Sequence, residues 1–129
     1  SLEPRQRSPA PAEGIRIALS KEELAALEQK DGQRLEIGLR NASGRRLEDV
    51  EVRVAVFSEN TAVEERRSYG EEVGSLAPGE RARVVVELDL SPLSPPREAP
   101  PEQPRRIIEV RVSAAGEPPR FKTAILPPG

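Results

Sequence analysis

The chain has 129 residues, which is enough for one domain with a single hydrophobic core and too few for two ordinary domains. Charged residues make up 33% of it but nearly balance, at a formal net charge of -2, so we expect no nucleic acid partner and no membrane contact within this chain. The absence of Cys and His excludes disulfides, the usual zinc sites and catalysis by Ser-His-Asp or Cys-His arrangements, and we expect no metal, no cofactor and no enzyme activity.

The two ends of the chain differ in composition from its middle. Residues 1–13 contain three prolines among polar residues and are predicted to form a linker, and residues 127–129 a tail. The folded β-sandwich domain is therefore expected over residues 14–126. Because the chain begins with Ser1 and not with methionine, we expect it to be part of a longer protein that carries any anchor or signal outside this chain.

The first predicted elements are a short strand and a short helix. Apolar residues alternate from Ile15 to Leu19, which predicts a strand. Ser20 is followed three residues later by Glu23, the pattern of a capping box, and Asp31-Gly32 provides a stop signal. We expect a connecting helix of about two and a half turns that packs across one end of the sheets.

The middle of the chain contains the strongest strand patterns. Alternation over residues 35–39 ends at the turn residues Asn41-Ala42-Ser43-Gly44, and the four valines of residues 50–56 then share one face of a strand. A Pro78-Gly79 turn precedes a third alternating strand over residues 82–90. Asn41-Ala42-Ser43 also has the form of a glycosylation acceptor, although a turn is the favoured interpretation.

The segment between these strands is less regular. Residues 61–74 carry many charges, which predicts an edge strand or a long hairpin, and Arg66 and Arg67 would discourage pairing with other sheets. Tyr69, the only tyrosine, belongs to the same segment. Residues 91–104 are too rich in proline for a helix or a central strand and are predicted to form a long surface loop.

The last part of the chain predicts two more strands. Residues 108–112 alternate, residues 116–119 (Gly-Glu-Pro-Pro) are predicted to turn, and residues 121–125 form the final strand. Short strands with this pattern predict an all-β fold, an immunoglobulin-like antiparallel β-sandwich of about seven strands with one short connecting helix. A small closed barrel is the alternative.

Three stretches resemble a known group of domains. They are residues 39–44 (Leu-Arg-Asn-Ala-Ser-Gly), residues 47–54 with their Val-x-Val pattern, and residues 76–80 (Leu-Ala-Pro-Gly-Glu). Together they resemble the immunoglobulin-like modules of bacterial envelope proteins, in particular the cell-adhesion-related domain found in bacteria (CARDB) and the FxLYD-type domains. The resemblance covers roughly residues 35–90 and implies the fold and an accessory role, without implying binding residues.

These observations predict a noncatalytic module of a larger bacterial envelope protein, located outside the cytoplasm, which acts as a spacer or a protein-interaction domain. Its partner would be another protein or a neighbouring domain, and its oligomeric state stays open. A sandwich exposes its edges and end loops, so Arg66, Arg67 and Tyr69 are the candidate partner-binding residues, together with the loop of residues 91–104. A carbohydrate-binding module attached to an enzyme is the alternative function, with Tyr69 as its stacking ring.

Overall fold

The structure is a computed structural model that describes residues 14–19, 27, 32–93 and 105–126. Over these residues the chain forms seven strands and no helix. The strands are β1 (Ile15–Ala18), β2 (Gln33–Asn41), β3 (Leu47–Ser58), β4 (Arg66–Leu76), β5 (Arg81–Leu88), β6 (Arg106–Ala114) and β7 (Glu117–Leu126).

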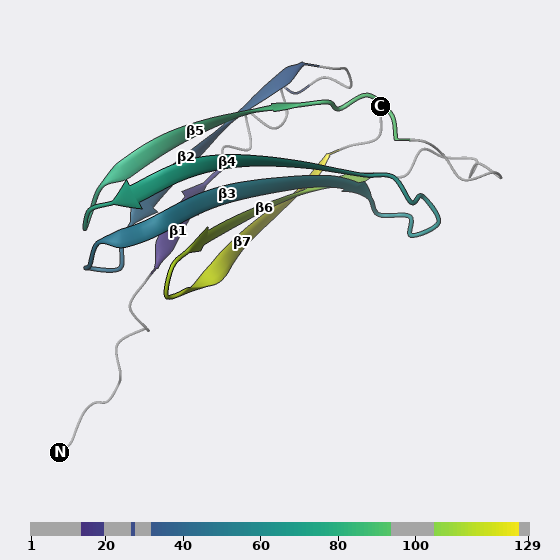
Figure 1. The fold of residues 1–129 in the computed structure, drawn as a ribbon. Coiled ribbons are helices and arrows are strands. Elements are labelled where there is room, and N and C mark those ends of the chain that lie inside the picture. The colour runs from purple at the N-terminus through teal and green to yellow at the C-terminus, as the bar shows by residue number, and fades with distance from the viewer. Residues whose placement is uncertain (1–13, 20–26, 28–31, 94–104, 127–129) are drawn as a thin grey trace.

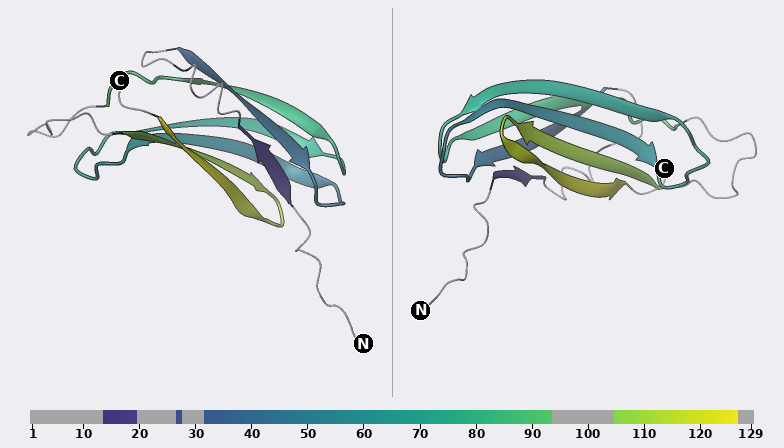
Figure 2. Two further views of the ribbon diagram at one scale, coloured as in Figure 1. Left: turned by 180° about the vertical axis from the view of Figure 1, so that it is seen from behind. Right: turned by 60° about the horizontal axis from the view of Figure 1, so that its bottom comes forward.

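The strands form two antiparallel sheets that face each other. One sheet has the order β1-β2-β5 and the other the order β4-β3-β6-β7, and Figures 1 and 2 show them as two curved layers. The chain passes from one sheet to the other after β2, after β4 and again after β5. The predicted immunoglobulin-like β-sandwich is therefore confirmed, and the closed barrel is wrong. In this chain the fourth strand, β4, pairs with β3, whereas in immunoglobulin constant domains the fourth strand belongs to the same sheet as the first.

The core between the sheets is aliphatic. Val52, Val54 and Val56 of β3 are buried with Ile37 of β2 and Ile108 of β6, each exposing 1% of its surface or less. The intervening residues of β3 point to the outer face, since side chains alternate along a strand. Neither phenylalanine belongs to this core, which is aliphatic apart from the partly buried ring of Tyr69 packed against it.

A buried asparagine fixes one corner of the sandwich. Asn41, fully buried at the end of β2, donates from Nδ2 to the carbonyls of Leu76 at 2.9 Å, Ala77 at 3.1 Å and Arg45 at 2.6 Å. Its Oδ1 accepts from the amide of Ser43 at 2.9 Å. The side chain thus serves the predicted turn, and its Nδ2 is inaccessible to a glycan in the folded chain.

The strands bear out most of the sequence pattern, with one correction. β4 is an edge strand, as one of the two alternatives predicted, and Pro78-Gly79 forms a turn in which Gly79 has a φ of 77°. The turn predicted over residues 116–119 is wrong beyond its first residue, because β7 already begins at Glu117. β7 is also an edge strand, where prolines are tolerated because half of the backbone amides have no partner strand to bind.

Several predictions fall outside the described residues. They are the linker of residues 1–13, most of the connecting helix after Ser20, residues 94–104 of the proline-rich loop and the tail of residues 127–129. Leu27, which is described, is half-buried and packs against the core.

Candidate functional site

The predicted partner-binding residues lie on both faces of β4. Arg66 is opposite Phe57 in the register with β3 and points to the outer face of the four-stranded sheet. Arg67 and Tyr69 are opposite the core residues Val56 and Val54, so both point toward the other layer. The three residues therefore do not form one surface.

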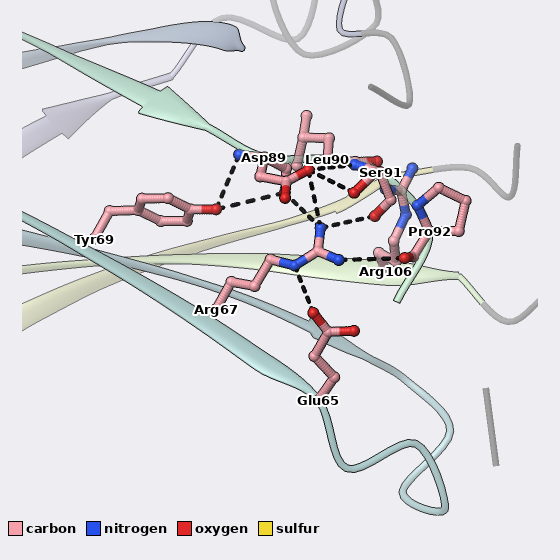
Figure 3. Close-up of polar contacts among 8 residues, drawn as sticks. All are labelled: Glu65, Arg67, Tyr69, Asp89, Leu90, Ser91, Pro92 and Arg106. Carbon is pink, nitrogen blue, oxygen red and sulfur yellow. Dashed lines mark hydrogen bonds and ion pairs between the residues drawn. The ribbon is translucent and has the colours of Figure 1, made fainter. Parts of the chain in front are cut away.

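Arg67 ties β4 to the chain that follows β5 (Figure 3). Its Nη1 donates to the carbonyls of Asp89 and Ser91, both at 2.7 Å, and its Nη2 to that of Pro92 at 3.2 Å. Its Nε donates to Oε2 of Glu65 at 2.8 Å, and the side chain is only 15% exposed. A guanidinium with so many internal acceptors holds an edge strand to the start of the proline-rich loop.

Tyr69 and Asp89 extend the same network. The Tyr69 hydroxyl accepts from the amide of Asp89 at 2.9 Å. Oδ1 of Asp89 accepts from Oγ of Ser91 at 2.6 Å and from its amide at 3.0 Å, and it lies 3.4 Å from Nη1 of Arg67. Hydrogen bonds from Ser91, with a smaller contribution from the charge of Arg67, hold the pKa of the Asp89 carboxyl below its ordinary value.

Arg106 completes this network from the first position of β6. It is 5% exposed and donates from Nη1 to the carbonyl of Leu90 (Figure 3). Burial, and then the nearby charge of Arg67, lower the pKa of the Arg106 guanidinium. We call this set of residues the polar clasp: Glu65, Arg67, Tyr69, Asp89, Ser91 and Arg106. It brings the predicted edge segment and the start of the predicted loop together, but its polar groups bind one another.

The outer face of the four-stranded sheet has an apolar row that crosses three strands. Phe57 of β3 is opposite Ile107 of β6, and Ile107 is opposite Ile125 of β7. Ile125 is 56% exposed, and Phe57 and Ile107 are half-buried. On the other side of Phe57, the Arg66 guanidinium lies 4.5 Å from the ring centre, within cation–π range.

A shallow hollow lies beside this row. Small side chains form its floor, since Ala55 is opposite Ser68 in the next cross-strand row. Phe121 of β7, 55% exposed, lies at its rim with the Arg111 guanidinium 5.9 Å from the ring centre. The hollow has a volume of about 290 Å³. We call this outer surface the aromatic face, defined by Phe57, Arg66, Ile107, Phe121 and Ile125.

The sequence contained a signal for the aromatic face. Phe57 follows Val56 directly and therefore has to point away from the core face of β3. Ile107 likewise occupies an outward position of β6, whose inner positions are buried. β7 carries no such signal for Ile125, because Leu126 is its only buried residue. Large apolar residues at positions that normally face water mark a candidate interaction surface, and of this set the sequence analysis singled out Arg66 alone.

No group of three or more Asp or Glu side chains in the described part of the chain could hold a metal ion. None of its segments forms a helix long and apolar enough to cross a membrane.

Fold and surface together define the class: a small immunoglobulin-like β-sandwich with an aliphatic core and an exposed aromatic face. Comparison with known proteins adds no family, since the sequence matches no protein family and no curated protein. Among solved structures it is similar to Spo0M, a sporulation control protein from Bacillus subtilis, with a TM-score of 0.48 and 9% sequence identity. That similarity covers 88% of this chain and 47% of Spo0M, so the chain spans under half the length of that protein.

Proposed function

We propose that this chain is a noncatalytic immunoglobulin-like accessory module of a larger bacterial envelope protein, placed outside the cytoplasm, and that it acts as a protein-interaction domain. The observation that carries the proposal is the aromatic face. Both phenylalanines of the chain lie on this one surface, with Phe121 and Ile125 more than half exposed.

The composition of the aromatic face supports a protein partner. Protein interfaces are enriched in aromatic residues and arginine, and Phe57 and Phe121 each have an arginine within cation–π range. Covering Ile125 and Phe121 would remove apolar area from water at about 25 cal/mol per Å². A spacer without partners would have no use for such a surface.

The polar clasp supports a noncatalytic role. Its most connected members, Arg67 and Asp89, bind backbone and side-chain groups of the same network. Groups that are already engaged in this way hold the fold and are poor candidates for acid–base chemistry on a substrate.

Site-directed photocrosslinking in the source cells tests the proposal. A photoreactive phenylalanine analogue at position 121 is expected to give a discrete crosslinked protein, and the same analogue at position 115, in the exposed turn between β6 and β7, is the matched control. The crosslink should disappear when Arg66→Glu and Ile125→Ser are added, with the melting temperature unchanged. A crosslink to a second copy of this chain would make the partner a dimer mate, and equal yields at positions 121 and 115 would argue against the aromatic face.

A carbohydrate-binding module attached to an enzyme is the second candidate. The observation in its favour is the exposed ring of Phe121 at the rim of the hollow. Tyr69 is a poor stacking ring, since it is half-buried and its hydroxyl binds the Asp89 backbone. Glycan-array binding that Phe121→Ala abolishes and Tyr69→Phe preserves would favour this candidate over the first.

A further inference from the structure

The outer face of the three-stranded sheet contains a row of three arginines. Arg16 of β1 is opposite Arg40 of β2, and Arg40 is opposite Arg81 of β5. Neighbouring strands lie about 4.8 Å apart, so the row extends over about 10 Å. We call Arg16, Arg40 and Arg81 the arginine row.

The arginine row has an excess of positive charge. Among the described residues, neither Arg40 nor Arg81 makes an ion pair or a side-chain hydrogen bond, while Arg16 has an interaction of its own. The next arginine on β5, Arg83, already forms an ion pair, with its Nε 3.4 Å from Oε1 of Glu36. Like charges directly opposite each other destabilise a sheet, so the adjacent guanidinium groups of Arg40 and Arg81, which have no partner among the described residues, suggest that an anion binds there.

A hollow of about 1060 Å³ lies over this end of the sheet. Small residues, Ala18 and Gly38, occupy the cross-strand positions beside the row. A Cβ on Gly38 would lie 3.3 Å from the Cβ of Ala18, so side chains there would fill the space. Ile17 and Leu19, both half-buried, also line the hollow, which therefore combines guanidinium groups with some apolar surface.

We propose that the arginine row binds a carboxylate-rich segment of a protein partner. The carboxylates would accept from the guanidinium groups of Arg40 and Arg81, and apolar side chains between them would pack into the hollow. This surface lies on the opposite side of the sandwich from the aromatic face, so the proposal stands independently of the function proposed above.

The limited extent of the positive charge favours a protein over a charged polymer. Toward the other end of this face the charges are already matched, because Arg83 pairs with Glu36 and Arg34 is opposite Glu87, so a long polyanion would meet no further excess of positive charge there. The whole chain has a net charge of -2. A protein partner can present a cluster of carboxylates that ends where the arginine row ends.

Calorimetry with the full chain and a synthetic peptide of alternating glutamate and leucine tests the proposal. We expect binding that weakens with salt and that a lysine–leucine peptide does not show. The double variant R40Q/R81Q should weaken binding at least about tenfold, because it removes two of the three charges of the arginine row. The control R34Q/R53Q removes the same charge from residues that do not line the hollow and should change affinity by less than about twofold.

Four results would overturn the proposal. The first is no peptide binding at millimolar concentration, and the second is an equal loss of affinity in both double variants. The third is arginine-dependent binding of a sulfated polysaccharide or RNA that is tighter than binding of the peptide. The fourth is a lower melting temperature in R40Q/R81Q, which would show that the row supports the fold. We expect an equal or higher melting temperature, because the substitutions relieve repulsion between neighbouring strands.

Discussion

At the scale of single residues, the amide of Asn41 is the clearest case of a polar group that the fold requires. It is fully buried, donates to the carbonyls of Leu76 and Ala77 at the end of β4 and of Arg45 after β2, and accepts from the Ser43 amide. If the Asn41 amide were removed, the buried carbonyl of Leu76 would lose this hydrogen-bond donor. A buried polar group without a partner lowers the stability of the fold.

Asn41→Ala is therefore expected to lower the free energy of unfolding by about 2–4 kcal/mol. Urea denaturation followed by circular dichroism measures this loss. Asn60→Ala is the matched control, since the half-buried Asn60 accepts only the amide of Ala62 through its side chain and should cost about 0.5–1.5 kcal/mol. Equal losses would contradict the role given to Asn41.

The carboxyl of Asp89 predicts a pH dependence of stability. Its pKa is lower in the folded chain than in the unfolded chain, where an aspartate has a pKa of about 3.9. The carboxylate therefore stabilises the fold above about pH 4, and this contribution is lost as the pH falls through the lowered folded-state pKa.

Asp89→Asn should thus be less stable than the parent chain at pH 7, and the difference should shrink toward about pH 2. Urea titrations at several pH values provide the test. Some acid sensitivity will remain, because a hydrogen bond from Arg105 also lowers the pKa of Glu59. Asp49→Asn is the control, since the Asp49 carboxyl has no polar partner among the described residues. A difference that stays constant with pH would contradict the effect assigned to Asp89.

At the scale of elements, β4 shows how one strand separates two functions. Arg67 is 15% exposed and donates to three backbone carbonyls, whereas its neighbour Arg66 is 53% exposed and stacks over Phe57. Two adjacent arginines thus have a structural role and a surface role, because consecutive side chains point to opposite faces.

Lysine at each of these positions distinguishes the two roles. Arg67→Lys should lower the free energy of unfolding by about 1–3 kcal/mol, because an ammonium group cannot reproduce the planar fork of donors. Arg66→Lys keeps the charge on an open surface and should change stability by about 0.5 kcal/mol or less. Urea denaturation of the pair checks this, and equal effects would mean that the polar clasp does not hold β4 in place.

The strands could be predicted from the sequence because alternation is a local property. The valines of β3 identify its buried face without knowledge of its neighbours, and the Pro78-Gly79 turn is likewise encoded locally. β7 was harder, because whether Pro118 ends a strand depends on its place at the edge of a sheet. The polar clasp was beyond prediction for the same reason, since it joins Arg67 to backbone groups more than 20 residues away.

At the scale of the whole molecule, the register between distant strands creates both candidate surfaces. The apolar row exists because Phe57 is opposite Ile107, and the arginine row because Arg40 is opposite Arg81. A pattern within one strand shows which residues face outward but not which residues of other strands lie beside them. The class of fold was therefore accessible from the sequence, while the aromatic face and the arginine row required the sheet order.

The shared core predicts that both sheets unfold together. Ile37 of the three-stranded sheet and Ile108 of the four-stranded sheet are fully buried members of one cluster, so removing either side chain weakens the same interface. Ile37→Ala and Ile108→Ala should each lower the free energy of unfolding by about 2–5 kcal/mol.

Both variants should keep a single transition, seen at the same urea concentration by circular dichroism and by the fluorescence of Tyr69, the only tyrosine. Tyr69 is a local probe, because its hydroxyl joins β4 to the backbone after β5, whereas circular dichroism reports on all strands. If Ile37→Ala moved one signal and left the other in place, the three-stranded sheet would be able to unfold separately. The sandwich would then be two weakly coupled layers, and a partner bound to one outer face could not stabilise the other.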